Sequence, residues 1–228
     1  MGWNEIRRSG REEPAVSREI QTLEQQLEAR DPDVRLMVQV RNDVQGAFES
    51  LVERHQNRLV GIFFHMVGSR EEAEDLCQEV FLRIYRARKG YRPRAKFATW
   101  LFTIANNLAL NHLRRKGRNP SVSLGGASGS QPVPGIAKHL EGREGTPSAQ
   151  VRQTELSDLV RDAMATLNED QKMAVLLNKF EEMSYAEIGD IMGRSPAAIK
   201  SLLARARTQL REQLEPYLLT GQRGPAGM

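Results

Sequence analysis

The sequence predicts an all-α protein with two small helical domains joined by a flexible linker, the second domain ending in a helix-turn-helix. Apolar residues recur at helical spacing from Asp33 to about residue 118, and again from Leu156 to about residue 215. The chain between Gly117 and Pro147 is instead rich in Gly, Ser and Pro and has no lasting periodicity. We therefore expect an N-terminal extension (1–30), a first domain (31–118), a linker (119–150), a second domain (151–217) and a tail (218–228).

Composition narrows the class of protein. The 228 residues are 39% hydrophobic and 27% charged, and no apolar run approaches the roughly 20 residues of a membrane span. The first residues, MGWNEIRRSGREEP, lack the apolar core of a secretory signal, so we expect a cytoplasmic protein. A single cysteine, Cys77, excludes an internal disulfide, and its place on an apolar helix face predicts a buried side chain. The scattered histidines indicate no zinc site, and no cofactor is expected.

In the first domain, a helix is expected to begin after Gly68, with Ser69 as its N-cap and Glu71 and Glu72 in its first turn. Opposite its apolar face we expect a polar stripe whose acidic residues come first along the chain and whose basic residues come last: Glu72, Asp75, Glu79, Arg83 and Arg86. After a loop from Gly90 to Lys96, a further helix carries Trp100, Thr103, Asn107, Asn111 and Arg114 on the face opposite its core residues. Asparagine is a poor helix former, so two on one face indicate a role beyond helix formation.

Charge is distributed unevenly along the chain. The net charge is only +4, yet no Asp or Glu occurs between Glu79 and Glu141, an interval that holds many arginines and lysines. Such a basic stretch favours a polyanionic partner, with a merely solvated basic face as the alternative.

The second domain contains the segment SYAEIGDIMGRSPAAIKSLLARARTQL. Ser184 and Glu187 form a capping box, Gly193 ends a short helix, and Ser195 with Pro196 begins a longer one. This pattern predicts a helix-turn-helix. The outer face of the longer helix alternates small with polar or basic residues, as a helix entering the major groove requires: Ala197, Lys200, Ser201, Ala204, Arg205 and Thr208. A packing unit with a solvated basic face is the alternative.

Four segments in order resemble the conserved regions of extracytoplasmic-function (ECF) RNA polymerase sigma factors: AFESLVERHQNRLVGIFFHMVG, AEDLCQEVFLRIYRA, KFATWLFTIANNLALNHLRRKGR and MSYAEIGDIMGRSPAAIKSLLARAR. The resemblance implies core RNA polymerase and promoter DNA as partners, with an anti-sigma factor as a possible third. It also implies that the first domain binds polymerase and the downstream (minus-10) element, while the second reads the upstream (minus-35) element.

The resemblance assigns residues to each partner. The AEDLCQEVF helix resembles the segment that docks on the polymerase clamp, which makes Asp75, Gln78 and Glu79 its polar contacts. Local pairing of these acids with Arg83 and Arg86 is the alternative. The DNA contacts expected in the two domains are Arg94, Lys96, Phe97, Trp100, Asn107, Asn111, Arg114 and Arg115, and then Ser195, Ala197, Lys200, Ser201 and Arg205.

Three further points concern Trp100, Leu202 and the competing functions. Larger relatives carry two adjacent tryptophans where this chain has Trp100 and Leu101, so a packing role for Trp100 is an alternative to base stacking. Relatives often have a basic residue at the position of Leu202, which we exclude from the DNA contacts because its spacing places it at the edge of the core face. A stand-alone helix-turn-helix regulator, and an enzyme using the carboxylates around Glu71 to Glu79 as metal ligands, are the competing functions.

Overall fold

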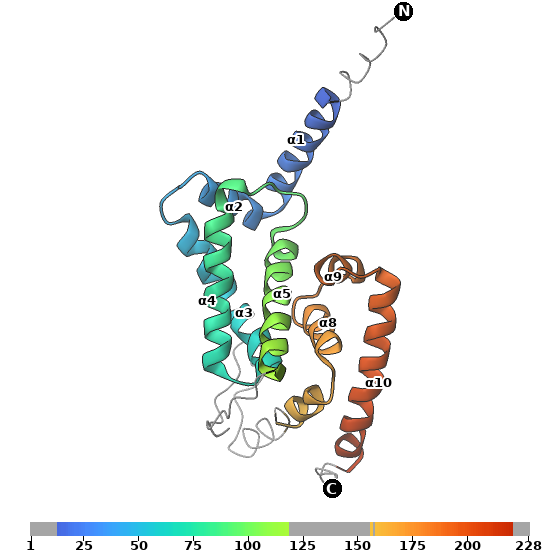
Figure 1. The fold of residues 1–228 in the computed structure, drawn as a ribbon. Coiled ribbons are helices and arrows are strands. Elements are labelled where there is room, and N and C mark those ends of the chain that lie inside the picture. Colours follow the sequence, from blue (N-terminus) through green and yellow to red (C-terminus); the bar gives the residue numbers. More distant parts are fainter. Residues whose placement is uncertain (1–12, 119–155, 157, 221–228) are drawn as a thin grey trace, which may run out of the picture.

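The computed structural model describes residues 13–118, 156 and 158–220, and every regular element within them is a helix (Figure 1). The first part comprises α1 (Glu13–Arg30), α2 (Pro32–Arg41), α3 (Ala47–Val67), α4 (Arg70–Ala87), a 3-10 turn η1 (Arg88–Gly90) and α5 (Phe97–Arg118). The second comprises α8 (Glu169–Lys179), α9 (Tyr185–Met192) and α10 (Pro196–Thr220), preceded by helical residues 158–165. The all-α prediction is confirmed, whereas the whole of the expected linker (119–150) lies outside the described residues.

Local capping sets the helix boundaries in the first part. Gly68 ends α3 at φ 80°, a left-handed conformation that glycine adopts without strain. Ser69 then begins α4, its hydroxyl accepting a hydrogen bond from the Glu72 amide at 3.4 Å. The extension, expected to be frayed or helical, is helical from Glu13 onward.

The helix-turn-helix is α9 followed by α10. Both capping boxes of the second part are present, Asn168 with Gln171 at α8 and Ser184 with Glu187 at α9. Gly193 ends α9 with φ 64°. A Cβ atom at Gly189 would lie 2.6 Å from the carbonyl oxygen of Arg194, so the tight turn requires glycine at that position.

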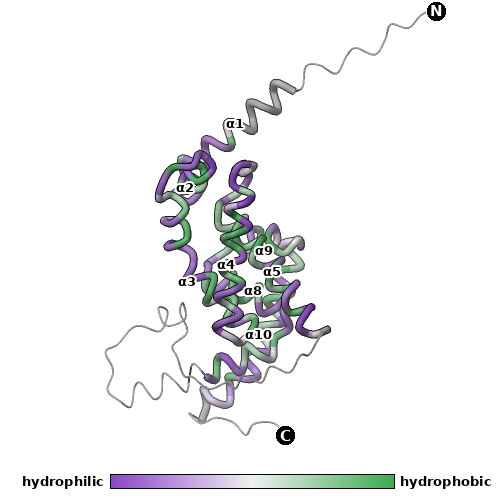
Figure 2. Tube along the Cα trace, turned by 60° about the vertical axis from the view of Figure 1, so that its left-hand side comes forward, coloured by the Kyte–Doolittle hydropathy of each residue, from purple (hydrophilic) through white to green (hydrophobic). Residues whose placement is uncertain are grey.

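The buried apolar residues of the two parts form one continuous core. Helix α5 packs against α9, and α3 packs against α8, so the second domain lies along the first. Figure 2 shows the apolar residues concentrated in the centre of the molecule, where α4, α5, α8 and α9 lie. Cys77 is buried in this core as predicted, and burial raises the pKa of its thiol to about 12. None of the helices within the described ranges has the length and apolarity of a membrane span.

Candidate functional site

The outer face of α4 carries the three residues expected to contact the polymerase. Asp75 and Gln78 are exposed, and Glu79 is half-buried. Glu79 accepts a hydrogen bond from Arg83 at 2.7 Å, which lowers the pKa of its carboxyl group. This is one of the local pairings considered as the alternative, but it lies in solvent, where an ion pair contributes little. The face therefore offers carboxylate and amide groups to a partner.

Glu72 has the spacing of the acidic stripe, but its contacts differ from those of the other members. Its carboxylate pairs with Lys116 at 2.7 Å and with His112 at 3.1 Å, so it joins α4 to α5 rather than facing a partner. Two large apolar residues on α4, Leu82 and Tyr85, are instead 48% and 43% exposed. Sequence reasoning missed them, although both fall outside the spacing of the buried face of α4.

The acidic residues of α4 show no metal-binding arrangement. Glu74 pairs with Arg70 at 2.8 Å along the helix. Nowhere in the described ranges do three His, Cys, Asp or Glu side chains come together in a way that suits a metal ion.

The loop before α5 and the start of α5 form a pocket of about 650 Å3. Its lining includes Arg92, Arg94, Trp100 and Thr103, together with Asp190 from α9. The Trp100 ring packs against Tyr91 with ring centroids 4.8 Å apart, and Trp100 keeps part of its surface open. The pocket thus combines positive charge with an aromatic face, which suits an unstacked base and its phosphate.

Other expected contacts follow α5 beyond the pocket. All four are exposed: Asn107, Asn111, Arg114 and Arg115. Lys96 is exposed as well, and its ammonium group pairs with Glu187 of α9 at 2.8 Å. This contact holds the pKa of Glu187 at about 2, with the Ser184 cap as the next cause.

Phe97 is buried, although the sequence analysis expected it to contact DNA. Its side chain is fully buried, with ring centroids 5.2 Å from His55 and 6.0 Å from Trp100. A stacking contact with a base would require this ring to leave the core. We therefore assign Phe97 to packing that supports Trp100, a role the sequence did not distinguish because an aromatic in a basic segment suits both.

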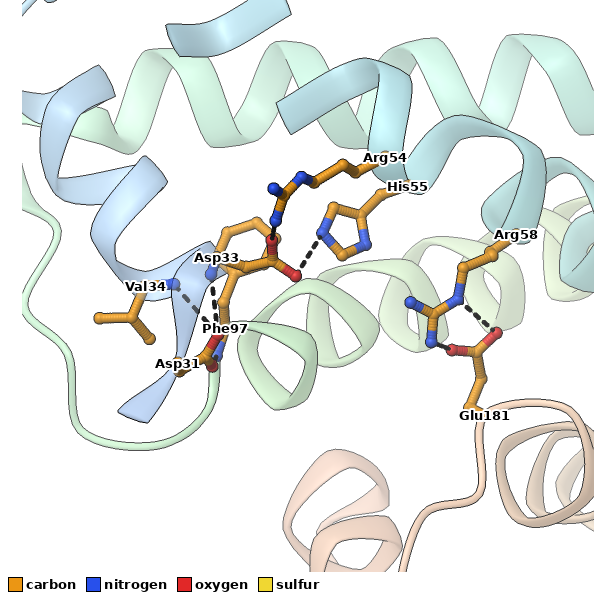
Figure 3. A network of polar contacts seen from close by, with 8 residues as sticks. All are labelled: Asp31, Asp33, Val34, Arg54, His55, Arg58, Phe97 and Glu181. Carbon is orange, nitrogen blue, oxygen red and sulfur yellow. Dashed lines mark hydrogen bonds and ion pairs between the residues drawn. The ribbon is translucent and has the colours of Figure 1, made fainter. Parts of the chain in front are cut away.

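A carboxylate network fixes the position of α5 (Figure 3). One oxygen of Asp31 accepts hydrogen bonds from the Asp33 and Val34 amides at 2.9 and 3.3 Å, and so caps α2. The other accepts from the Phe97 amide at 2.9 Å, at the start of α5. Asp33 in turn pairs with Arg54 at 2.7 Å and with the buried His55 at 3.0 Å, while burial lowers the pKa of His55. One side chain therefore caps two helices, which sequence spacing did not indicate.

The outer face of α10 holds the remaining candidates. All five are exposed: Ser195, Ala197, Lys200, Ser201 and Arg205. Ser195 also caps the helix, accepting from the Ala198 amide at 3.2 Å. Leu202 is 6% exposed, which agrees with its exclusion from the DNA contacts.

Family models match both domains of the chain. Residues 51–119 match the family model for sigma-70 region 2, and residues 157–210 match that for sigma-70 region 4. The chain is 31% identical to RNA polymerase sigma-H factor of Pseudomonas aeruginosa over 83% of its own length and 97% of the relative's. It is 32% identical to the ECF sigma-E factor of Haemophilus influenzae over 82% of its own length and 97% of the relative's.

Two solved structures share the fold. CnrH, in complex with the cytosolic domain of CnrY, has a TM-score of 0.57 at 22% identity, covering 82% of this chain and 99% of CnrH. The sigma factor RpoE of Bartonella quintana, in complex with the anti-sigma factor NepR, has the same TM-score and identity, covering 75% of this chain and 98% of RpoE. With both conserved regions matched in order and relatives aligned over most of their length, the chain belongs to the ECF group of RNA polymerase sigma factors.

Proposed function

We propose that this sigma factor divides its work among three helix faces. The outer face of α4, with Asp75, Gln78 and Glu79, binds the polymerase. The loop before α5 and the exposed face of α5 hold the opened downstream element, and α10 reads the upstream element. The observation that carries this division is that the three sets of residues lie on different helices with different chemistry: acidic and apolar on α4, basic with an aromatic pocket at α5, small and basic on α10.

For α10, the physical reason is close approach. Ala197 and Ser201 are small and exposed, so the helix backbone can lie deep in the major groove. Lys200 and Arg205 then reach phosphates or guanine edges. No acidic residue occurs from Ile191 through Arg211 to repel the DNA.

For α5, the reason is capture of a strand that has left the duplex. Arg94, which lines the pocket, and Lys96, which is exposed, hold its backbone through their positive charge, and Trp100 offers a ring face in the pocket for an unstacked base. Further along, Asn107 presents an amide with both a donor and an acceptor for a base edge. Phe97 supports this surface from within the core.

We further propose that the chain acts in the cytoplasm as a binding subunit, without catalytic chemistry or a cofactor of its own. An anti-sigma factor is a proposed third partner. This rests on analogy with RpoE, which is described in complex with NepR.

Run-off transcription tests the proposal. Purified chain is added to core polymerase on a library of genomic fragments, and the start sites are mapped. A sigma factor yields discrete transcripts that share two spaced elements. A stand-alone regulator yields none without another sigma factor. On a promoter found in this way, Trp100→Ala is expected to impair transcription from duplex DNA and from a pre-melted bubble alike, because the ring is proposed to hold a base after the strands have separated.

A further inference from the structure

Four large apolar side chains are exposed in the described parts of the chain, and all four belong to the first domain and the helix that precedes it. Leu23 of α1 is 44% exposed. The other three lie where α3 and α4 meet the loop after α2: Val44, Leu82 and Tyr85, at 50%, 48% and 43%. Apolar residues gathered in this way, rather than scattered singly, indicate contact surfaces.

The three residues that lie together are arranged around a fourth, the half-buried Phe48, and we call this set the apolar patch. The ring centroids of Phe48 and Tyr85 are 4.9 Å apart. The Arg88 guanidinium lies over the Tyr85 ring, 3.9 Å from its centroid. Tyr85 is thus held in place before any partner arrives, which lowers the entropic cost of binding.

The surroundings of the apolar patch are basic and fixed to α4. Asp43, which directly precedes Val44, pairs with Arg88 at 3.3 Å and also pairs with Lys89. These contacts tie the loop after α2 to the end of α4. Arg86 and Lys89 are exposed beside the patch, so a partner needs an apolar row flanked by acidic side chains.

Helix α1 has this character. Its apolar residues follow each other at spacings of four, three and four: Val16, Ile20, Leu23 and Leu27. The helix carries four acidic residues and two basic ones. Leu27 packs against the core, but α1 projects from the first domain, as Figure 1 shows, and it lies outside both family matches. A helix of this length is marginal in water unless its apolar face is covered.

The α1 helix is not placed to cover the apolar patch of its own chain. A single residue, Asp31, joins it to α2, and the Asp31 carboxylate is bonded to the Asp33, Val34 and Phe97 amides. These bonds fix the direction in which α1 leaves the domain. Pairing of α1 with the α1 of another copy would bring acidic residues together.

We propose that α1 of one copy packs across the apolar patch of a second copy, and that two such contacts about a two-fold axis form a dimer. Each copy then gives one helix and receives one, so the assembly closes as a pair. The apolar row of α1 covers Tyr85 and Leu82, while its acidic residues meet Arg86 and Lys89.

The dimer has a consequence for the outer face of α4. Leu82 lies one helical turn after Gln78, so α1 of the second copy and the polymerase compete for neighbouring parts of this face. This consequence rests on the proposed function of α4, whereas the dimer does not.

Sedimentation velocity of the full chain, from about 1 to 100 µM, tests the inference. The wild type is expected to pass from monomer to dimer across this range. Tyr85→Glu removes the fixed ring and adds an acid to the patch, and Leu23→Arg adds a base to α1. Each variant is expected to weaken dimerisation on the order of 30-fold.

A mixture of the two variants gives the sharper result. In the mixed pair, α1 of the Tyr85→Glu chain meets the unaltered patch of the Leu23→Arg chain, and the second contact joins opposite charges. The mixture should therefore dimerise at lower concentrations than either variant alone, which loss of folding or damage to an unrelated surface would not produce.

Matched controls add the same charges elsewhere. Gln25→Arg changes the opposite side of α1, and Gln56→Glu changes an exposed position of α3, so both should dimerise like the wild type. Circular dichroism checks that each variant keeps its helices. A wild-type chain that stays monomeric at the highest concentration, a dimer that neither variant weakens, or a mixture no more dimeric than its components would overturn the inference. Loss of core binding in Tyr85→Glu, with a monomeric wild type, would assign the patch to the polymerase instead.

Discussion

The outer face of α4 and the exposed face of α5 belong to one domain, yet they differ in their contact with the second domain. On α4, Asp75 and Gln78 lie in solvent beside the exposed Leu82. On α5, the pocket around Trp100 is shared with Asp190 of the second domain. The proposed polymerase-binding face is thus exposed, whereas the proposed downstream-element face is exposed at Asn107 and Asn111 but is contacted by the second domain at the pocket and at Lys96. The difference indicates that α4 presents a surface made by the first domain alone, while the start of α5 shares its surface with the second domain.

The largest effect is expected on the outer face of α4, the proposed polymerase-binding face. Asp75→Ala with Glu79→Ala should weaken binding to core polymerase about 30-fold, corresponding to the ~2 kcal/mol typical of an interface hot spot. Both residues lie on a polar face, so the thermal midpoint should stay close to wild type. Fluorescence anisotropy with labelled core gives the affinity. As the control, Glu49→Ala with Glu53→Ala removes the same charge from exposed positions of α3. Equal affinities for the two double variants would contradict the assignment of this face.

The outer face of α10, proposed to read the upstream element, is exposed at Lys200 and Arg205. Lys200→Ala and Arg205→Ala should each weaken recognition of the upstream element by about 1–3 kcal/mol if the contact is to a base edge. A phosphate contact should instead lower affinity on all sequences and reduce the slope of log K against log salt by about one. Arg211→Ala, which removes the same charge at an exposed position further along the same helix, is the control. Wild-type promoter binding by holoenzyme in both variants would show that the reading face of α10 is misassigned.

Asp31 links α5, which carries the proposed downstream-element face, to the rest of its domain. Asp31→Ala removes caps from both α2 and α5, so it should reduce the free energy of unfolding by about 1–2 kcal/mol. Asp31→Asn keeps one acceptor oxygen, so it should retain one of the two caps. Urea unfolding measures stability, and transcription from duplex and bubble promoters measures opening. If α5 is positioned through Asp31, the Asn variant should recover stability more fully than opening on the duplex.

The sequence predicted the features that are set by near neighbours. The capping box at Ser184, the turn at Gly193 and the burial of Cys77 each depend on a few adjacent residues, and all are confirmed. Contacts between domains carry no such signal. The partners Lys96 and Glu187 are separated by a linker without periodicity, so nothing in either segment indicates the other.

The sequence also could not decide between two roles for some residues. Phe97 suits both a stacking group and a core residue, and only its full burial separates the two. Glu72 shares the spacing of the acidic stripe on α4, yet it bonds to Lys116 across the domain. Leu82 breaks the apolar spacing, and such an exception is the signal that points to a partner surface.

The smallest effect is expected from a single exposed amide on α5. Asn107→Ala should lower transcription by the few-fold that loss of one hydrogen bond of about 1 kcal/mol produces. Because an amide has no net charge to offer a phosphate, core binding and salt dependence should stay as in the wild type, while preference at the downstream element relaxes. The neighbouring Asn106 supplies the contrast. It is 3% exposed, so Asn106→Ala should change the free energy of unfolding and leave promoter preference intact. Run-off transcription on promoters with each base of the downstream element changed compares the two variants. Identical base preferences in wild type and Asn107→Ala would remove this residue from the reading face, and a changed salt slope would make its contact a phosphate.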